Sequence, residues 1–265
     1  LHANDNFCTA LGYQASEIIG QHHRLFLSSE ESSKPEYKIF WETLKQGKYV
    51  SGEFKRLDKQ GNEVWIQASY NPILDMNGEP FKVVKYATDI TQEKLRNADF
   101  QSQMQAVSKA QAVIEFDLQG NILTANDNFC QTLGYSLNEI QGQHHRIFAS
   151  PEYAESQAYT DFWEQLRAGE FQAGEYERIG KQGNSVWIQA SYNPIFDMNG
   201  KPFKVVKYAT DVSARVNVVK LVESTLSKLE GGNLSVTISE DVPPEFEPLK
   251  SSINNTVAKL NQVIV

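Results

Sequence analysis

Alternating hydrophobic and polar residues mark three extended segments in the second half of the chain. They are Phe171–Ile179, Asn184–Phe196 and Pro202–Val212, which are rich in Val, Ile, Tyr and Phe. Successive side chains of a β-strand point to opposite faces, so this alternation predicts strands with one buried face. The glycine-containing turns at 180–183 and 197–200 favour antiparallel hairpins between them.

Two upstream segments, Ala112–Leu118 and Asn121–Ala125, predict a first hairpin. Gly120 between them suits a turn residue with positive φ. From there to Phe171, apolar residues recur at helical spacing. The expected order, two strands, four helices and three strands, describes an α+β domain: a five-stranded antiparallel sheet with helices on one face.

The helical part divides at its capping residues. Asn126 is placed to cap a first short helix. The capping-box sequence of Ser136–Ile140 predicts a second, and His144–Phe148 a further helical turn. The longest helix is expected over Ala154–Ala168, where Gly169 would stop it.

The chain carries this pattern twice. ANDNFCTALGY begins at residue 3 and ANDNFCQTLGY at 125, VWIQASYNPI begins at 64 and 186, and PFKVVKYATD at 80 and 202, always 122 positions apart. A repeat of this length is a whole domain rather than a solenoid unit. No counterpart of the first strand precedes Leu1, and a helical pattern runs to Val265. We therefore expect a first copy without its opening strand, in a piece of a longer protein.

Helical stripes also lie outside the two copies. Gln92–Gln111 lacks Gly and Pro and has an apolar stripe spaced by four and three residues, which predicts an amphipathic helix. It is either a rigid linker that pairs in a dimer or a helix packed on its own sheet. After the second copy, similar stripes predict two helices separated by a break at 230–233 and an extended connector from Leu234. Pro243 and Pro244 suit the first turn of the second helix.

Composition limits the classes of function. The chain has 265 residues with 40% hydrophobic and 22% charged residues, as expected for two or three folded domains. A net charge of −8 argues against nonspecific nucleic-acid binding. No apolar run has the length of a membrane span, and no signal peptide is visible. Cys8 and Cys130, one in each copy, indicate buried thiols in a reducing compartment.

Motifs shared by the two copies resemble those of PAS sensory domains. An N-x-x-F…G-Y helix at 4–13 and 126–135 is followed by E-I-x-G, F-W-x-x-L-x-x-G and K-x-G-x-x-x-W, and each copy closes with D-I-T or D-V-S. The resemblance implies one PAS domain over 1–91, a helical linker over 92–110 and a second PAS domain over 111–213.

Residues 214–265 resemble a HAMP segment through the pieces G-N-L-S-V-T-I, P-E-F-E-P-L and I-N-N. Such helix pairs assemble as a parallel four-helix bundle in a dimer; a simple coiled-coil hairpin is the alternative. The whole arrangement resembles the input region of soluble bacterial chemoreceptors of the aerotaxis and biofilm-dispersal type. The resemblance implies a cytoplasmic homodimer, joined through its linker and C-terminal helices, that controls a chemotaxis kinase and its coupling protein through a domain beyond Val265.

The closing triplets are candidates for signal relay. Asp89 or Thr91 in the first copy, and Asp211 or Ser213 in the second, can accept the first backbone N–H groups of the helix that follows. A strand then passes directly into a helix, so a shift of the sheet reorients that helix. An ordinary helix cap without a relay role is the alternative.

PAS domains bind ligands between their helices and their sheet, so polar residues on these helices are the first site candidates. His22 and His23, like His144 and His145, begin a helical turn, and adjacent helical residues point about 100° apart. One histidine of each pair at most therefore faces the pocket. A neutral imidazole there can ligate haem iron or hydrogen-bond a flavin; packing or capping the helix is the alternative.

Two cofactors are candidates, and a pocket without a cofactor is the third alternative. The motif G-Q-x-H and the tryptophans Trp41 and Trp163 match the FAD-binding aerotaxis branch of the family, which implies FAD. Haem b would use one of the four histidines as its metal ligand, and no other metal site is expected. Cysteinyl photochemistry is excluded, because His23 stands where the light-sensing branch has its reactive cysteine.

Several residues of the long central strand are candidates of lower specificity. Asn71 and Asn193, each before a proline, either cap or contact a ligand. Trp65 and Trp187, with Tyr70 and Tyr192, are interpreted as sheet packing rather than cofactor contacts.

An enzyme is the rival class of function. The missing part could be a histidine kinase or a cyclic-di-nucleotide enzyme, and a protein-interaction adaptor without cofactor is a further alternative. Within the 265 residues there is no P-loop, no GGDEF-like run and no nucleophile–His–acid arrangement. We therefore expect a signalling protein without catalytic residues in this chain.

Overall fold

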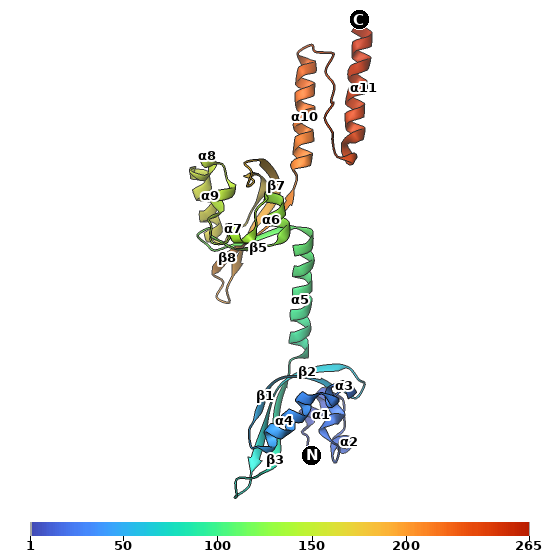
Figure 1. Cartoon of the computed structure of the whole chain (residues 1–265), viewed down its shortest axis with the longest axis vertical. Coiled ribbons are helices and arrows are strands. Elements are labelled where there is room, and N and C mark those ends of the chain that lie inside the picture. The colour runs from blue at the N-terminus through green and yellow to red at the C-terminus, as the bar shows by residue number, and fades with distance from the viewer. Residues whose placement is uncertain (1, 265) are drawn as a thin grey trace. The chain divides into compact units, whose positions relative to one another are not determined.

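The computed structural model describes residues 2–264, with side chains to Gln262. The chain forms two compact units, residues 1–104 and 105–265 (Figure 1). Each unit contains one copy of the repeat, and each is described separately.

The second unit has the predicted five-stranded antiparallel sheet, in the order β5-β4-β8-β7-β6. Its helices lie between the second and third strands along the chain, as the sequence predicts. The elements are β4 (Ala112–Phe116), β5 (Ile122–Ala125), α6 (Asp127–Leu133), α7 (Leu137–Ile140), the 3-10 helix η2 (His145–Phe148), α8 (Pro151–Ala154), α9 (Gln157–Arg167), β6 (Gln172–Ile179), β7 (Ser185–Phe196) and β8 (Pro202–Asp211).

A single long helix was predicted over Ala154–Ala168, and the predicted start of that helix is wrong. The chain forms α8, which ends at Ala154, and then α9, which begins at Gln157. The Ser156 hydroxyl accepts a hydrogen bond from the Tyr159 N–H, which makes Ser156 an N-cap and starts a new helix there. The stripe of Tyr159, Phe162, Trp163 and Leu166 is buried as predicted.

The first unit has the same helices and the last three strands of the pattern. Its sheet has the order β1-β2-β3, so the five-stranded sheet expected of a complete domain is present only in the second unit. Its elements are α1 (Asp5–Leu11), α2 (Ala15–Ile18), the 3-10 helix η1 (His23–Phe26), α3 (Ser29–Ser33), α4 (Pro35–Lys45), β1 (Val50–Leu57), β2 (Glu63–Leu74) and β3 (Pro80–Asp89).

The predicted linker is helical as α5 (Thr91–Ala110), and none of its side chains is buried. Phe100 is 63% exposed, so this part of the stripe is not packed on a sheet. The end of α5 is held by Asn126, whose Nδ2 donates to the carbonyls of Ser108 and Gln111 at 2.7 and 2.8 Å. The same side chain accepts from the Phe129 N–H at the start of α6. One asparagine thus joins the linker to the first helix of the second unit.

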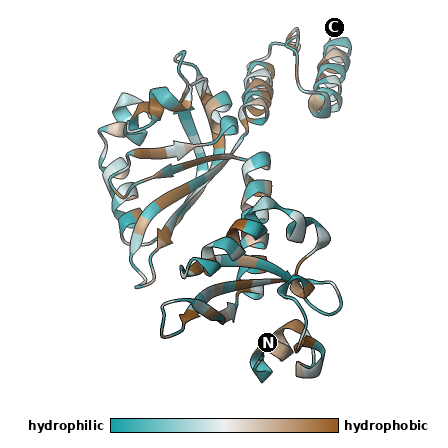
Figure 2. Cartoon of the chain, turned by 60° about the horizontal axis from the view of Figure 1, so that its bottom comes forward, coloured by the Kyte–Doolittle hydropathy of each residue, from teal (hydrophilic) through white to brown (hydrophobic). Residues whose placement is uncertain are grey.

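Beyond β8, the chain forms α10 (Ser213–Glu230), the 3-10 helix η3 (Pro244–Phe246) and α11 (Glu247–Ile264). The break at 230–233 is found as predicted, but Leu234 and Ser235 lie in a turn rather than an extended segment. α10 and α11 lie side by side, with hydrophobic and hydrophilic residues interleaved along both (Figure 2). The apolar stripe predicted for the second of these helices spans Phe246, Leu249, Ile253, Thr256, Leu260 and Val263, and the side chain of Val263 lies outside the described residues.

Candidate functional site

His145 lies at the centre of the core of the second unit. It begins η2, and its side chain has no exposed surface. Its Nδ1 is 2.9 Å from the Tyr159 hydroxyl on α9, and its Nε2 is 3.1 Å from the Tyr192 hydroxyl on β7. Burial first, then the charges of Arg178 and Lys207, hold the pKa of His145 well below its usual value. The imidazole is therefore neutral, with both ring nitrogens hydrogen-bonded.

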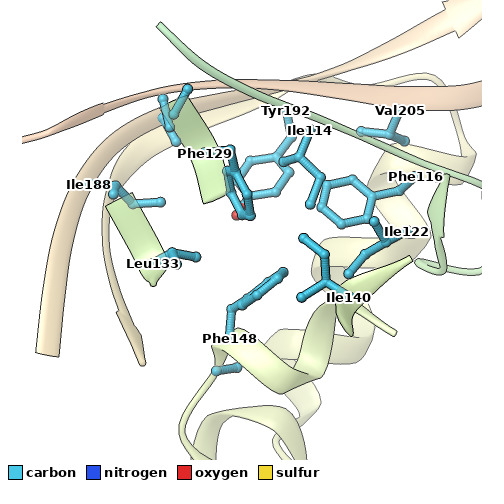
Figure 3. Packing of buried hydrophobic residues seen from close by; sticks show 14 of the residues in the cluster. Ile114, Phe116, Ile122, Phe129, Leu133, Ile140, Phe148, Ile188, Tyr192 and Val205 are labelled. Atoms are coloured by element: carbon cyan, nitrogen blue, oxygen red, sulfur yellow. The ribbon is translucent and has the colours of Figure 1, made fainter. Parts of the chain in front are cut away.

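Aromatic rings surround this imidazole from the helices and the sheet. It stacks on Tyr159 and Phe162 at centroid distances of 5.8 and 6.2 Å, and meets Phe116 and Trp163 edge-on at 5.3 and 5.5 Å. The apolar core continues toward Phe129, Phe148 and Ile140, where Phe129 and Phe148 point toward each other (Figure 3).

Tyr192 connects this cluster to the edge strand β6. Its hydroxyl lies 3.0 Å from the Nη2 of Arg178, which donates a hydrogen bond to it. Arg178 is 2% exposed, and its second amino group donates to the Glu177 carbonyl. The Arg178 Nε has no hydrogen-bond partner. The guanidinium is thus buried among tyrosines, without a carboxylate bonded to it among the described residues.

Lys207 on β8 is the second buried basic residue, with no exposed surface and no hydrogen-bond partner for its Nζ. The Nζ lies over the rings of Phe129 and Tyr192, at 5.4 and 4.9 Å from their centroids. These are cation–π distances. Burial first, then the charge of Arg178, hold the pKa of Lys207 well below its usual value.

The first unit repeats this arrangement with looser contacts. The His23 Nδ1 and Nε2 lie 3.2 and 3.3 Å from the Tyr37 and Tyr70 hydroxyls, and Arg56 donates to Tyr70 at 2.9 Å. Burial and the neighbouring positive charges lower the pKa of His23 to about 3. Burial, then Arg56, lowers the pKa of Lys85 to about 7. Two copies of one polar cluster therefore occupy the two cores.

The other histidine of each pair, His22 or His144, caps a helix. The geometry therefore agrees with the expectation that at most one histidine of each pair faces the core. The Nδ1 of His22 and of His144 accepts the backbone N–H two residues later, at 3.2 and 3.1 Å. His144 also lies against Gly120, whose φ is +87°. A Cβ on Gly120 would come within 2.9 Å of the His144 Nε2 and 3.0 Å of Trp163. The predicted turn glycine is thus also required by close packing.

The two asparagines predicted as site residues lie on the other face of the sheet. Tyr192 belongs to the buried, helix-facing set of β7, and Asn193 alternates with it. The Asn193 Nδ2 donates to the Ser191 hydroxyl and the Val206 carbonyl at 3.1 and 3.3 Å, and Asn71 donates to Val84. The structure therefore does not bring these asparagines together with the histidines.

The closing triplets form a clamp between strand and helix in each unit. Asp211 accepts the Ser213 N–H at 2.8 Å, as Asp89 accepts that of Thr91. The hydroxyl of Ser213 accepts the Trp187 N–H of β7 at 2.9 Å, and that of Thr91 accepts the Trp65 N–H at 2.9 Å. The aspartates bond to the helix start as expected, whereas Thr91 and Ser213 tie it to the central strand.

His145 does not fit the role of a haem ligand in this arrangement. Iron would need a free ring nitrogen, and both nitrogens of His145 are hydrogen-bonded to tyrosines. A flavin placed between His145 and Trp163 would have to separate rings that are in edge-on contact. Among residues 2–264 there is also no group of three or more His, Cys, Asp or Glu side chains that could hold a metal ion.

Sequence reasoning found the histidines and tryptophans of the cluster but missed its basic residues. The missed residues are Arg56, Arg178, Lys85 and Lys207. Strand alternation was the available signal: Lys207 shares a face with Val205 and Ala209, both buried. Tyr192, interpreted as sheet packing, is also the hydrogen-bond centre of the cluster.

The fold and the core cluster define a sensory domain of the PAS class. A family model described as PAS fold matches residues 1–87 and 122–209, so the chain belongs to the PAS family. The two matched ranges fall in the two copies of the repeat.

Relatives of known name include a biofilm dispersion protein and an aerotaxis receptor. The chain is 44% identical over 214 residues to the biofilm dispersion protein BdlA of Pseudomonas aeruginosa, covering 81% of this chain and 51% of BdlA. It is 38% identical over 79 residues to the aerotaxis receptor of Escherichia coli, covering 30% and 15% of the two chains. The chain thus spans about half of BdlA and less of the receptor.

Among solved structures, a PAS domain from Colwellia psychrerythraea aligns with a TM-score of 0.39 and 22% identity. The alignment covers 43% of this chain and 96% of that domain. Within residues 2–264, no helix is both long enough and apolar enough to cross a membrane.

Proposed function

We propose that this chain is the sensory part of a chemotaxis-type transducer, located in the cytoplasm and active as a homodimer. A ligand or redox event in a PAS core shifts the sheet, and the helices after Asp89 and Asp211 carry that shift to a kinase-controlling domain. Similarity to BdlA and to the aerotaxis receptor supports this class. FAD stays an untested candidate; haem b would require the His145 hydrogen bonds to break.

The clamp at the end of each sheet is the observation that carries the proposal. Tyr192 and Trp187 lie on the same strand, with Tyr192 bonded to His145 inside the core and Trp187 bonded to Ser213 at the start of α10. Any displacement of β7 by the core therefore moves the first turn of α10. The second bond, from the Val212 N–H to the Trp187 carbonyl at 2.8 Å, makes this junction stiff.

Replacing Ser213 with alanine is expected to uncouple kinase control from the core. The change removes the acceptor of the Trp187 N–H and costs about 1 kcal/mol of stability, so the domain stays folded. The measurement is the activity of a chemotaxis kinase bound to a receptor in which this chain precedes a kinase-control domain, under oxidising and reducing conditions. Ser227→Ala on the exposed side of α10 is the matched control. An unchanged response in Ser213→Ala would contradict the relay.

A HAMP arrangement of α10 and α11 is part of the proposal. Asn254 of the I-N-N piece holds the connector, because its side chain accepts the Ile238 N–H at 2.8 Å and donates to the Ile238 carbonyl at 3.0 Å. Ile238 and Val257 are buried at 3% and 2% exposure. A groove of about 110 Å³ between the helices is lined by Leu226, Leu229, Ser252, Ile253, Thr256 and Val257. Two such pairs would close into a four-helix bundle.

The chain is expected to be a dimer in solution, held by the apolar residues that α10 and α11 leave exposed. Leu226, Leu249 and Leu260 are 50%, 44% and 38% exposed. Replacing Leu249 and Leu260 with glutamate should give a monomer by light scattering, because like charges would meet in the seam. Lys259→Glu, at an exposed polar position of α11, is the matched control and should stay dimeric. A monomeric unaltered chain would refute the dimer.

A further inference from the structure

Among the described residues, seven buried side-chain polar atoms lack a hydrogen-bond partner: one is the Glu31 Oε2 on α3, and the other six, in the two PAS cores, are donors. In the second unit they are the Trp163 Nε1, the Arg178 Nε and the Lys207 Nζ, and in the first unit they are the Trp41 Nε1, the Arg56 Nε and the Lys85 Nζ. The same three positions are unpartnered in both copies. Unpaired buried donors are costly, so their repetition points to a missing acceptor.

The charge of the cluster has one sign. Burial first, then Arg178 and Lys207, lower the pKa of His145, and burial first, then Arg178, lowers that of Lys207. No carboxylate is among the groups that perturb either residue. Buried charges in proteins are normally paired, and the described residues supply no negative partner. Arg178 donates to the Tyr192 hydroxyl at 3.0 Å, while the Lys207 Nζ lies over the Tyr192 ring at 4.9 Å from its centroid, so both basic side chains contact the same tyrosine.

We propose that each PAS core binds a small carboxylate, with its oxygens held by Lys207 and Arg178 in the second unit and by Lys85 and Arg56 in the first. This ligand class deepens the sensory function proposed above and rests on it. The apolar tail would lie among the rings that surround Tyr192, which favours a carboxylate over phosphate, an anion without an apolar part. The close ring contacts restrict the ligand to a few heavy atoms.

Carboxylate binding would also restore the charged form that burial disfavours in both lysines. A carboxylate beside Lys207 replaces solvation that the core removes, so the ammonium form returns. Binding is therefore coupled to proton uptake, one proton for each lysine that is neutral beforehand. The pKa of Lys85 is lowered to about 7, so proton uptake at this lysine is expected above about pH 7.

The test uses the full chain with acetate, propionate and butyrate as probes, and acetamide and propionamide as neutral isosteres. Calorimetry in buffers of different ionisation enthalpy is expected to show two carboxylate sites per chain with proton uptake, and no binding of the amides. Lys85→Met and Lys207→Met should each remove one site, and the double variant both, with at least a tenfold loss of affinity at the altered site. Lys201→Met, at an exposed position of the turn before β8, is the control.

Three outcomes would overturn the inference: no carboxylate bound at millimolar concentration, equal binding of the amides, or binding that survives in the double variant. Inorganic phosphate is a separate arm, and binding of phosphate without any carboxylate would overturn the ligand class. Failure here leaves the relay testable through Ser213→Ala. If Ser213→Ala did not uncouple the kinase, the relay would be contradicted, but carboxylate binding could still be tested by calorimetry.

Discussion

Replacing Lys207 with methionine is expected to stabilise the ligand-free second unit by about 2 kcal/mol at neutral pH. Lys207 is fully buried without a hydrogen-bond partner, and burying an unpaired polar group typically costs about 1–3 kcal/mol. Methionine keeps the length of the side chain and its contact with Phe129 and Tyr192 while removing the amine. The measurement is the free energy of unfolding by denaturant.

The pH dependence of the free energy of unfolding tests independently whether the Lys207 amine is buried and unpaired. Burial lowers the pKa of Lys207 in the folded state, so the unfolded chain binds more protons than the folded one at every pH between the two values. Stability therefore rises with pH through that window, up to the ordinary lysine value of 10.5. Lys207→Met should lose this rise, whereas the exposed Lys201→Met should keep it. A destabilised Lys207→Met protein with an unaltered pH profile would contradict a buried, unpaired amine.

Replacing Tyr192 with phenylalanine is expected to destabilise the second unit by about 2–3 kcal/mol, although the two side chains have nearly the same shape. The change leaves the His145 Nε2 and the Arg178 Nη2 without the partners they have at 3.1 and 3.0 Å. Both groups are buried, and unsatisfied buried groups cost about 1–3 kcal/mol each, more when charged. Denaturant unfolding, followed through Trp163, measures the change.

The first unit supplies the control for this prediction. Tyr70 makes the matching bonds to His23 and Arg56, but the His23 contact is longer at 3.3 Å and His23 is only partly buried. Tyr70→Phe should therefore cost less than Tyr192→Phe, because water can reach the groups left behind. Equal costs in the two units, or a neutral Tyr192→Phe, would show that the hydrogen bonds around the histidine do not stabilise the core.

Much of the fold was predictable because its signals are local. Strand alternation located β6, β7 and β8, and the asparagine cap located the start of α6. The error at Ala154–Ala168 arose because Ser156 can sit inside a helix or cap one, and only tertiary packing decides. Cys130, predicted as a buried thiol, is only half-buried: it packs against the core, and burial, then Asp127, raises its pKa.

The site was predictable only in part, for a different reason. His145 could be found because the family motif marks it, but the role of a lysine in a strand depends on which face the sheet buries. Lys204 and Lys207 come from the same segment: Lys204 bonds Glu115, while Lys207 points into the core. Their difference follows from register, which pairs Lys207 with Tyr192 and Ile114. A basic residue on an apolar strand face, repeated at Lys85, was the sequence signal for this core.

We expect the core to communicate with the helix beyond the sheet, and hydrogen exchange measures this most directly. Tyr159→Phe removes one bond to His145 and leaves the clamp residues untouched. It should speed exchange of the Trp187 amide and of the first turn of α10 more than that of the β4 amides, which report unfolding of the whole unit. Asn193→Ala, on the opposite face of β7, is the control. An acceleration in Tyr159→Phe that is confined to η2 and α9, or is equal throughout the unit, would contradict the relay from core to helix.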